Sequence, residues 1–229
     1  MGNATARTKT PKGIDVWVMS ARWWTGLQRK NPFNQRLNPI QPDNIRSGAV
    51  EQTIMSQMQD VRIESGYRPG CIGRIAELHG TYYHAHWGFG LYFEAKVATE
   101  LSAFMQRHDD NRDGFWLAVQ HERIEGAVVI DGLHAGNEGA HLRWFIISDA
   151  LRGKGVGRAL LQKATDFCNQ QGYQKTYLWT FEGLDVARHL YEDAGFRLIK
   201  EQDGVQWGTP VNEQYFERTA SSPFPAARY

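Results

Sequence analysis

Three glycines within five residues separate a strand-like apolar run from the start of an amphipathic helix. The run HLRWFII at 141–147 is followed by RGKGVG at 152–157, and the helical pattern begins at Val156. In a strand–loop–helix arrangement, consecutive backbone N–H groups point into one concavity at the positive end of the helix. We therefore predict an anion site suited to a diphosphate, in which the glycines allow close backbone approach and the cations add charge. Its residues are Arg152, Gly153, Lys154, Gly155, Val156, Gly157 and Arg158.

Two other anion-binding motifs fit this segment poorly. A P-loop needs Ser or Thr after Gly-Lys to bind magnesium, whereas Gly155 follows Lys154. A dinucleotide fingerprint needs glycines at wider spacing and an acidic residue about 20 positions later. For the segment taken alone, an exposed turn rich in Gly and Lys stays open as an alternative. That alternative explains neither the position between a strand and a helix nor the three glycines.

The composition limits the class of protein. A chain of 229 residues suits one domain, or one domain with an appendage, and a net charge of +1 gives no general reason to expect a nucleic acid or a membrane as partner. No run of about 18 apolar residues or signal-peptide pattern is visible. The two cysteines, Cys71 and Cys168, have neither zinc nor redox spacing. We therefore expect a cytoplasmic protein.

Charge divides the chain unevenly. Residues 1–58 carry eight Lys/Arg and three Asp/Glu, a balance of +5, which leaves −4 for the remainder. We interpret 1–58 as a basic, weakly ordered extension, 59–218 as the folded domain and 219–229 as a tail. Three alternatives stay open for the extension. It could be a nucleic-acid arm, or a segment that docks on a partner through Trp17, Trp23 and Trp24. The third alternative is a later start of the chain at Met55 or Met58.

Hydrophobic periodicity predicts an α/β (α+β) fold with a mixed sheet and helices on its faces. Apolar residues at helical spacing favour helices over 71–86, 91–107, 156–172 and 185–193. Strands are expected over 60–65, 114–120, 124–130, 141–147, 175–181, 196–202 and 213–218. The segment at 175–181, KTYLWTF, is apolar or β-prone at nearly every position, so we predict a central strand buried on both faces.

Two linked motifs resemble a known family. Arg152, Gly155 and Gly157 match Gln/Arg-x-x-Gly-x-Gly/Ala, which is motif A of the GNAT superfamily of acetyl-CoA-dependent N-acetyltransferases. ARHLYEDAGFRLIKE at 187–201 is similar to that family's Ala-x-x-Leu-Tyr-x-x-x-Gly-Phe segment. ELHGTYYHAHWG, LWTFEGLDVARHLY and AGFRLIKEQ resemble more closely the acetyltransferase half of proteins with a MarR-type winged helix. Because 58 residues are too few for a winged helix, DNA binding is not carried over.

The resemblance implies a GNAT fold whose sheet is splayed between its fourth and fifth strands, with the thioester of acetyl-CoA in the gap. A primary amine of a small molecule or peptide would attack it directly in a ternary complex, without a metal. The strand before motif A would present Phe145, Ile146 and Ile147 to the pantetheine arm and the acetyl carbonyl. Tyr191 stands at the family's general-acid position, and relatives of this kind imply a homodimer. One departure is Leu184, where many members have Asn.

The acid–base and acceptor groups are less constrained. Glu182, after the strand at 175–181, is our candidate general base, with Glu77 and His79 as competitors. A metal site of His79, His84 and His86 is discounted because His84 lies off the face of the other two. Aromatic residues of the first two helices are expected to line the acceptor pocket, namely Tyr82, Tyr83, His86 and Trp87. A non-catalytic acyl-CoA-responsive binding module stays open as the alternative function.

Overall fold

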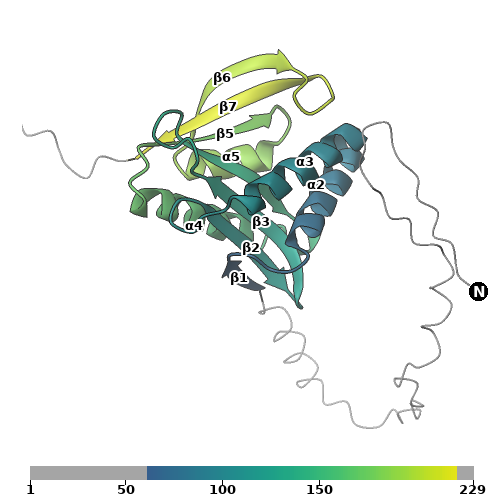
Figure 1. The fold of residues 1–229 in the computed structure, drawn as a ribbon. Helices are drawn as coiled ribbons and strands as arrows, with labels where there is room; N and C mark the ends of the chain where they lie inside the picture. The colour runs from purple at the N-terminus through teal and green to yellow at the C-terminus, as the bar shows by residue number, and fades with distance from the viewer. Residues whose placement is uncertain (1–60, 221–229) are drawn as a thin grey trace, which may run out of the picture. The chain divides into compact units, whose positions relative to one another are not determined.

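The computed structural model describes residues 61–220, which form a seven-stranded mixed sheet with helices packed against it (Figure 1). The extension at 1–58 lies outside this range, with the proposed later starts at Met55 and Met58. So do all but two residues of the tail at 219–229. The elements are β1 (Val61–Ser65), α2 (Cys71–Trp87), α3 (Leu91–Gln106), β2 (Gly114–Gln120), β3 (Arg123–Asp131), β4 (Ala140–Ile147), η3 (Asp149–Leu151), α4 (Val156–Gln170), β5 (Lys175–Phe181), α5 (Asp185–Asp193), β6 (Arg197–Gly204) and β7 (Val211–Thr219).

The order of strands across the sheet is β1-β2-β3-β4-β5-β7-β6, and the only parallel pair in the described range is β4 with β5. This confirms the predicted mixed sheet and every predicted helix and strand, with small differences at their ends. The short 3₁₀ helix η3, between β4 and the glycine loop, was not predicted. Within residues 61–220, no helix is long and apolar enough to cross a membrane.

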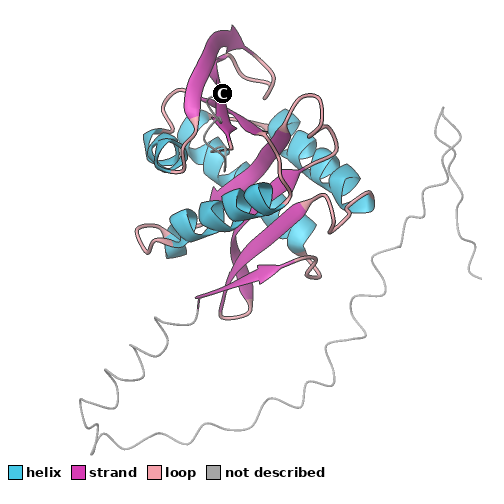
Figure 2. Cartoon of the chain, turned by 90° about the vertical axis from the view of Figure 1, so that its left-hand side faces the viewer, coloured by secondary structure: helices cyan, strands magenta, loops and turns pink. Residues whose placement is uncertain are grey.

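Alternation along β2 shows how the sheet separates two cores. Phe115 and Leu117 pack with the apolar faces of α2 and α3, whereas Trp116 and Ala118 pack with α4 and α5. Successive side chains of a strand point to opposite faces, so the two helix pairs cover opposite faces of the sheet. Figure 2 shows these helices on both sides of the twisted strands. β2 and β3 are almost entirely buried between them.

A bulge in β4 opens the sheet at its centre. Val129 pairs with Arg143 and Ala127 with Ile146, so one residue of β3 faces both Trp144 and Phe145. Trp144 has φ 46°, a left-handed conformation that is strained for a bulky residue. Bulges bend the strand that carries them. β4 and β5 pair only at two positions near their starts and then diverge, which confirms the splay between the fourth and fifth strands.

The prediction that β5 is buried on both faces was wrong for alternate residues. Thr176, Leu178 and Thr180 are buried, but Tyr177 and Trp179 are only half-buried. The physical reason is the splay, because a strand that loses its neighbour also loses the cover that a continuous sheet and its helices provide. The half-buried residues of β5 therefore face a cavity instead of a packed core.

The β2–β3 hairpin offers a test of local strain. His121 and Glu122 have φ of 48° and 60°, values that fit a tight hairpin turn and favour Asn and Gly. The exposed His121 side chain makes no hydrogen bond or ion pair with any residue from 61 to 220. His121→Asn is therefore expected to raise the free energy of unfolding by about 0.5–1 kcal/mol, measured by urea denaturation. The control is His134→Asn at an exposed position with negative φ, and an equal gain there would contradict the strain argument.

Candidate active site

The loop before α4 adopts the conformation that its glycine spacing predicts. Gly153 and Gly155 have φ of 73° and 76°, a region that glycine enters without strain. Gly155 is the N-cap of α4, and no side chain caps that helix end. The N–H groups of residues 155–158 donate no hydrogen bond to any other described residue, and residues 152–155 are exposed. The structure thus presents the unpaired amides that an anion site requires.

The three cations of this loop have different partners. Lys154 is exposed and has no ion pair within the described range. The side chain of Arg158 is 3.1 Å from Asp193 of α5. Arg152 forms an ion pair with Asp149, and its Cζ lies 4.3 Å from the centre of the Tyr82 ring of α2. Arg152 therefore links the glycine loop to the first helix, a contact that the sequence did not predict.

A cavity of about 460 Å³ lies where β4 and β5 diverge. The two strands contribute residues 141–145 and 177–181 to its wall. The remaining lining residues are His79 and Tyr83 of α2, Phe93, Lys96, Val97 and Glu100 of α3, Tyr191 of α5, and Gln206 and Trp207 between β6 and β7. The cavity therefore receives side chains from both faces of the sheet.

Phe145 connects this cavity to the glycine loop. Its ring lines the cavity and lies 5.8 Å, centre to centre, from the ring of Tyr191. A Cβ at Gly157 would be 3.5 Å from the Phe145 ring and 3.2 Å from Leu190, so glycine allows the first turn of α4 to pack closely here. Of the residues predicted beside it, Ile146 is buried and Ile147 half-buried, and neither side chain lines the cavity.

Tyr191 lies at the wall of the cavity. It is 6% exposed and packs against Phe196 and Phe216. Its hydroxyl has no hydrogen-bond partner among residues 61–220. Burial, and to a lesser extent the neighbouring Tyr83, raise the pKa of Tyr191 above the ordinary value of 10.0. The phenol is therefore protonated at neutral pH and has a proton available to a group in the cavity.

Only one of the three candidate bases lines the cavity. Glu182 is exposed, does not line the cavity, and accepts a 3.4 Å hydrogen bond from Asn212. Glu77 is also exposed and forms an ion pair with Arg74. His79 alone of the three lines the cavity, and its Nδ1 is 2.8 Å from the carbonyl oxygen of Ile75.

The predicted aromatic pocket is only partly assembled around the cavity. Tyr83 lines it, whereas Tyr82, His86 and Trp87 form an adjoining cluster in which Trp87 contacts Phe181 at 5.4 Å between ring centres. His84 is separate, because its Nδ1 bonds to the carbonyl oxygen of Phe89. Within residues 61–220, no group of three or more His, Cys, Asp or Glu is arranged to bind a metal ion.

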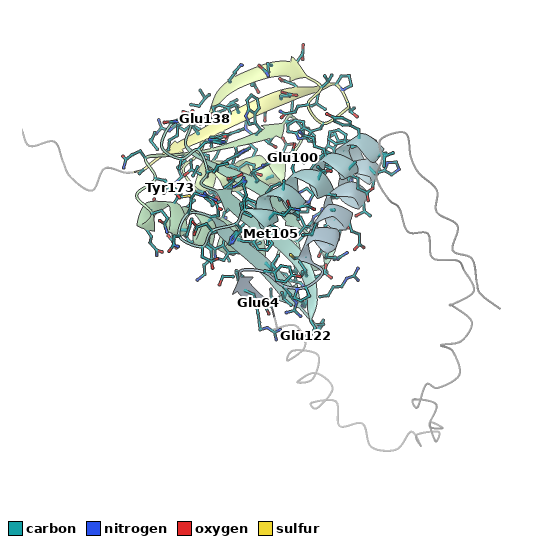
Figure 3. The ribbon with its side chains drawn as sticks, viewed as in Figure 1. Glu64, Glu100, Met105, Glu122, Glu138 and Tyr173 are labelled. Atoms are coloured by element: carbon teal, nitrogen blue, oxygen red, sulfur yellow. The ribbon has the colours of Figure 1, made fainter. Side chains whose placement is uncertain are left out.

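The three charged residues that line the cavity were not identified by sequence analysis. Lys96 and Glu100 come from α3, where Glu100 is labelled in Figure 3, and Arg143 comes from β4. Glu100 forms ion pairs with both cations. One signal was present, because Arg143 places a charge within the largely apolar run at 141–147. A cation within a buried strand needs a partner or a ligand.

The buried His79 makes stability depend on pH. Burial lowers the pKa of His79 from 6.5 to about 4, so the unfolded chain takes up this proton before the folded one as the pH falls. The contribution of neutral His79 to the free energy of unfolding is complete above the ordinary pKa of 6.5 and is lost as the pH falls toward 4. We expect His79 to remove about 2 kcal/mol of stability between pH 7 and pH 5.

Urea denaturation at the two pH values tests this expectation. His79→Leu should reduce the loss on acidification, whereas His189→Gln, at an exposed position on α5, should not. An unchanged loss in His79→Leu would show that other groups cause the acid sensitivity. His141, whose pKa burial lowers to about 3, contributes in the same direction.

Comparison with known proteins agrees with this architecture. The chain is 27% identical over 134 residues to N-acetylaspartate synthetase of Homo sapiens, an alignment that covers 58% of this chain and 44% of the relative. It is 26% identical over 119 residues to an uncharacterized N-acetyltransferase of Methanocaldococcus jannaschii, covering 50% of this chain and 53% of that protein. The chain thus spans about half the length of these curated relatives.

Solved structures share the fold at low sequence identity. A GNAT-family acetyltransferase of Staphylococcus aureus superposes with a TM-score of 0.55 at 19% identity, covering 69% of this chain and 98% of that one. The Salmonella typhimurium protein yncA, solved with its cofactor acetyl-CoA, has a TM-score of 0.54 at 14% identity, covering 73% and 99% of the two chains.

The family profile covers both motifs that the sequence singled out. The acetyltransferase (GNAT) family matches residues 73–196, which is more than half of the chain and includes the glycine loop, the splayed strands and Tyr191. Sequence motifs, sheet topology and similarity to solved acetyltransferases therefore lead to the same conclusion: this chain belongs to the acetyltransferase (GNAT) family.

Proposed function

We propose that this enzyme transfers the acetyl group of acetyl-CoA to a primary amine of a small molecule or peptide, by direct attack in a ternary complex. One observation carries the proposal. A cavity reaches through the gap between β4 and β5, and Phe145 joins it to a loop of unpaired amides on one face of the sheet. The names of the similar proteins, N-acetyltransferase and N-acetylaspartate synthetase, support an amino group as the acceptor.

The donor side of the site fits coenzyme A. The free N–H groups of residues 155–158, together with the exposed Lys154, suit a diphosphate at the N-terminus of α4. From there the backbone of residues 145–147 leads along β4 into the gap. We propose that this stretch holds the pantetheine arm. Leu184 supplies no polar group at the position where many family members have Asn, so the backbone of β4 carries more of this contact.

The residues at the gap have distinct tasks in acetyl transfer. Acetyl-CoA, when bound, supplies the acetyl thioester. Beyond His141, β4 has no pairing with β5, so a backbone N–H on that open edge, close to the bulge at Trp144, would be suited to stabilise negative charge that develops on the thioester carbonyl oxygen. Tyr191 would then donate its phenolic proton to the departing thiolate.

The attacking amine must lose a proton, and the base for this step stays a prediction. Glu182 reaches the cavity only through solvent or through movement, since its side chain lies outside the lining. If Nδ1 of His79 donates to Ile75, the other ring nitrogen is an acceptor, but the low pKa of this imidazole makes it a weak base. A water-mediated proton loss is consistent with both placements.

A thiol-release assay tests the proposed function. Purified protein, acetyl-CoA and a panel of primary amines should release coenzyme A at a rate that depends on the amine, with N-acetyl product identified by mass spectrometry. Tight binding of coenzyme A without turnover of any amine would instead favour the non-catalytic acyl-CoA-responsive module. The cytoplasmic location, the homodimer and the closer relation to MarR-type fusion proteins stay predictions.

A further inference from the structure

The face of the cavity lined by α3 contains a compact charged group. Lys96 and Glu100 lie one helical turn apart on α3 and form an ion pair, and Glu100 also forms an ion pair with Arg143 of β4. All three line the cavity, and the side chain of Arg143 is only 20% exposed. With two cations and one carboxylate, the group has an excess positive charge of one.

The position of Arg143 is fixed by its surroundings. Its Cζ lies 4.0 Å from the centre of the Trp144 ring, and Nη1 is 3.7 Å from a carboxylate oxygen of Asp131. The bulge at Trp144 shifts the side-chain alternation of β4 by one residue, so that Arg143 and Trp144 point to the same face. Asp131 is itself paired with Arg107, so this outer carboxylate does not neutralise the cavity.

Hydrogen-bond donors exceed acceptors on this face. Glu100 uses one N–H each of Lys96 and Arg143, which leaves two donors on the ammonium and most of those on the guanidinium. The indole N–H groups of Trp179 and Trp207 also have no partner among residues 61–220. Such a surface is complementary to a ligand that carries acceptor atoms and negative charge, and it disfavours a ligand with several positive charges.

We propose that the acceptor amine carries a carboxylate and that Arg143 and Lys96 bind this carboxylate. The inference rests on the proposed function, since it concerns the second substrate of the same site. Glu100 holds the two cations in place and leaves their outward donors free. The amino group of such a substrate would lie toward the gap between β4 and β5, on the side of the sheet opposite α4 and α5.

Matched substrates test the inference. Leucine, phenylalanine and lysine are each paired with the amine that lacks the carboxylate, namely 3-methylbutylamine, 2-phenylethylamine and cadaverine, and aspartate is added as a dicarboxylate. For the wild type we expect kcat/KM to be at least about tenfold higher for the best carboxylate-bearing amine than for its partner. Arg143→Gln and Lys96→Gln should each reduce that ratio severalfold, chiefly through KM.

Two confounding effects are controlled, amine basicity by the comparison of ratios and misfolding of a variant by a binding measurement. The solution basicity of each amine is the same for every variant, so a change in the ratio reports on the protein. Binding of coenzyme A, measured by calorimetry, shows whether each variant is folded with an intact donor site. Arg188→Gln, an exposed ion-pair residue of α5, should leave the ratio unchanged.

The outcomes separate the two proposals. Efficient turnover of amines without a carboxylate, with ratios that neither substitution alters, would overturn the inference and leave the proposed function standing. If no amine is turned over, the proposed function fails, and the inference is tested by calorimetry with the amino acids in the presence of coenzyme A. Binding that weakens in Arg143→Gln would support it, and absence of binding in the wild type would overturn it.

Discussion

Replacing Tyr191 by Phe is expected to lower kcat by about 10²–10⁴-fold while coenzyme A still binds. The thiolate that leaves during acetyl transfer needs a proton, and the Tyr191 hydroxyl is positioned at the cavity wall without a hydrogen-bond partner among the described residues. Its raised pKa keeps that proton in place at neutral pH. Because no hydrogen bond is lost, the substitution should change the free energy of unfolding only slightly.

Tyr173→Phe is the matched control. Tyr173, labelled in Figure 3, lies outside the cavity and donates a 2.7 Å hydrogen bond to the carbonyl oxygen of Arg112. Loss of that bond should reduce stability by about 1 kcal/mol and leave kcat unchanged. The opposite pattern, a stable enzyme with low kcat, is expected for Tyr191→Phe. If kcat falls in Tyr83→Phe and not in Tyr191→Phe, the acid is Tyr83, a half-buried tyrosine that also lines the cavity.

Gly155→Glu should weaken binding of coenzyme A by at least about 100-fold. A side chain at φ 76° is strained, and the added carboxylate repels an anion at the free amides of α4. A Cβ at this position meets no atom within 4 Å, so the effect does not arise from a clash with the core. Calorimetry with coenzyme A measures the loss directly.

The other end of α4 supplies the control for this substitution. Gly172 has φ 70°, and a Cβ there also meets no atom within 4 Å. Gly172→Glu therefore introduces the same residue and similar backbone strain away from the predicted diphosphate site. Both variants should lose a similar amount of stability, while only Gly155→Glu loses affinity. Undiminished binding in Gly155→Glu would refute the assignment of the diphosphate to this loop.

Local features of the sequence were sufficient to predict the order of elements and the glycine loop. Helical and alternating patterns extend over a few residues, and left-handed φ values at Gly153 and Gly155 follow from the residue type. Tyr191 could be predicted as a site residue only through the family motif, since a helix tyrosine beside a sheet is also an ordinary packing residue. The splay between β4 and β5 was likewise implied by resemblance and not by local pattern.

The acceptor side of the site depended on contacts between residues that are distant in the sequence. Glu100 and Arg143 are 43 positions apart and meet only when α3 packs over β4. Glu182 follows a strand that lines the cavity, yet its own side chain lies outside that cavity. Arg152 contacts Tyr82 of α2, although motif spacing placed it only beside the diphosphate.

The sequence by itself determined the order of elements and the left-handed glycines of the loop before α4, because each follows from periodicity or from the conformational freedom of glycine within a short segment. The fold family was implied by the resemblance of two motifs, and anion binding by the loop stays a prediction. The tertiary structure alone decided which side chains enter the cavity and what charge they give it. The physical reason is the bulge at Trp144. The bulge changes the face of the sheet to which the neighbouring side chains point, and it separates β4 from β5. The bulge depends on how β4 pairs with β3, and this pairing cannot be predicted from the local sequence pattern.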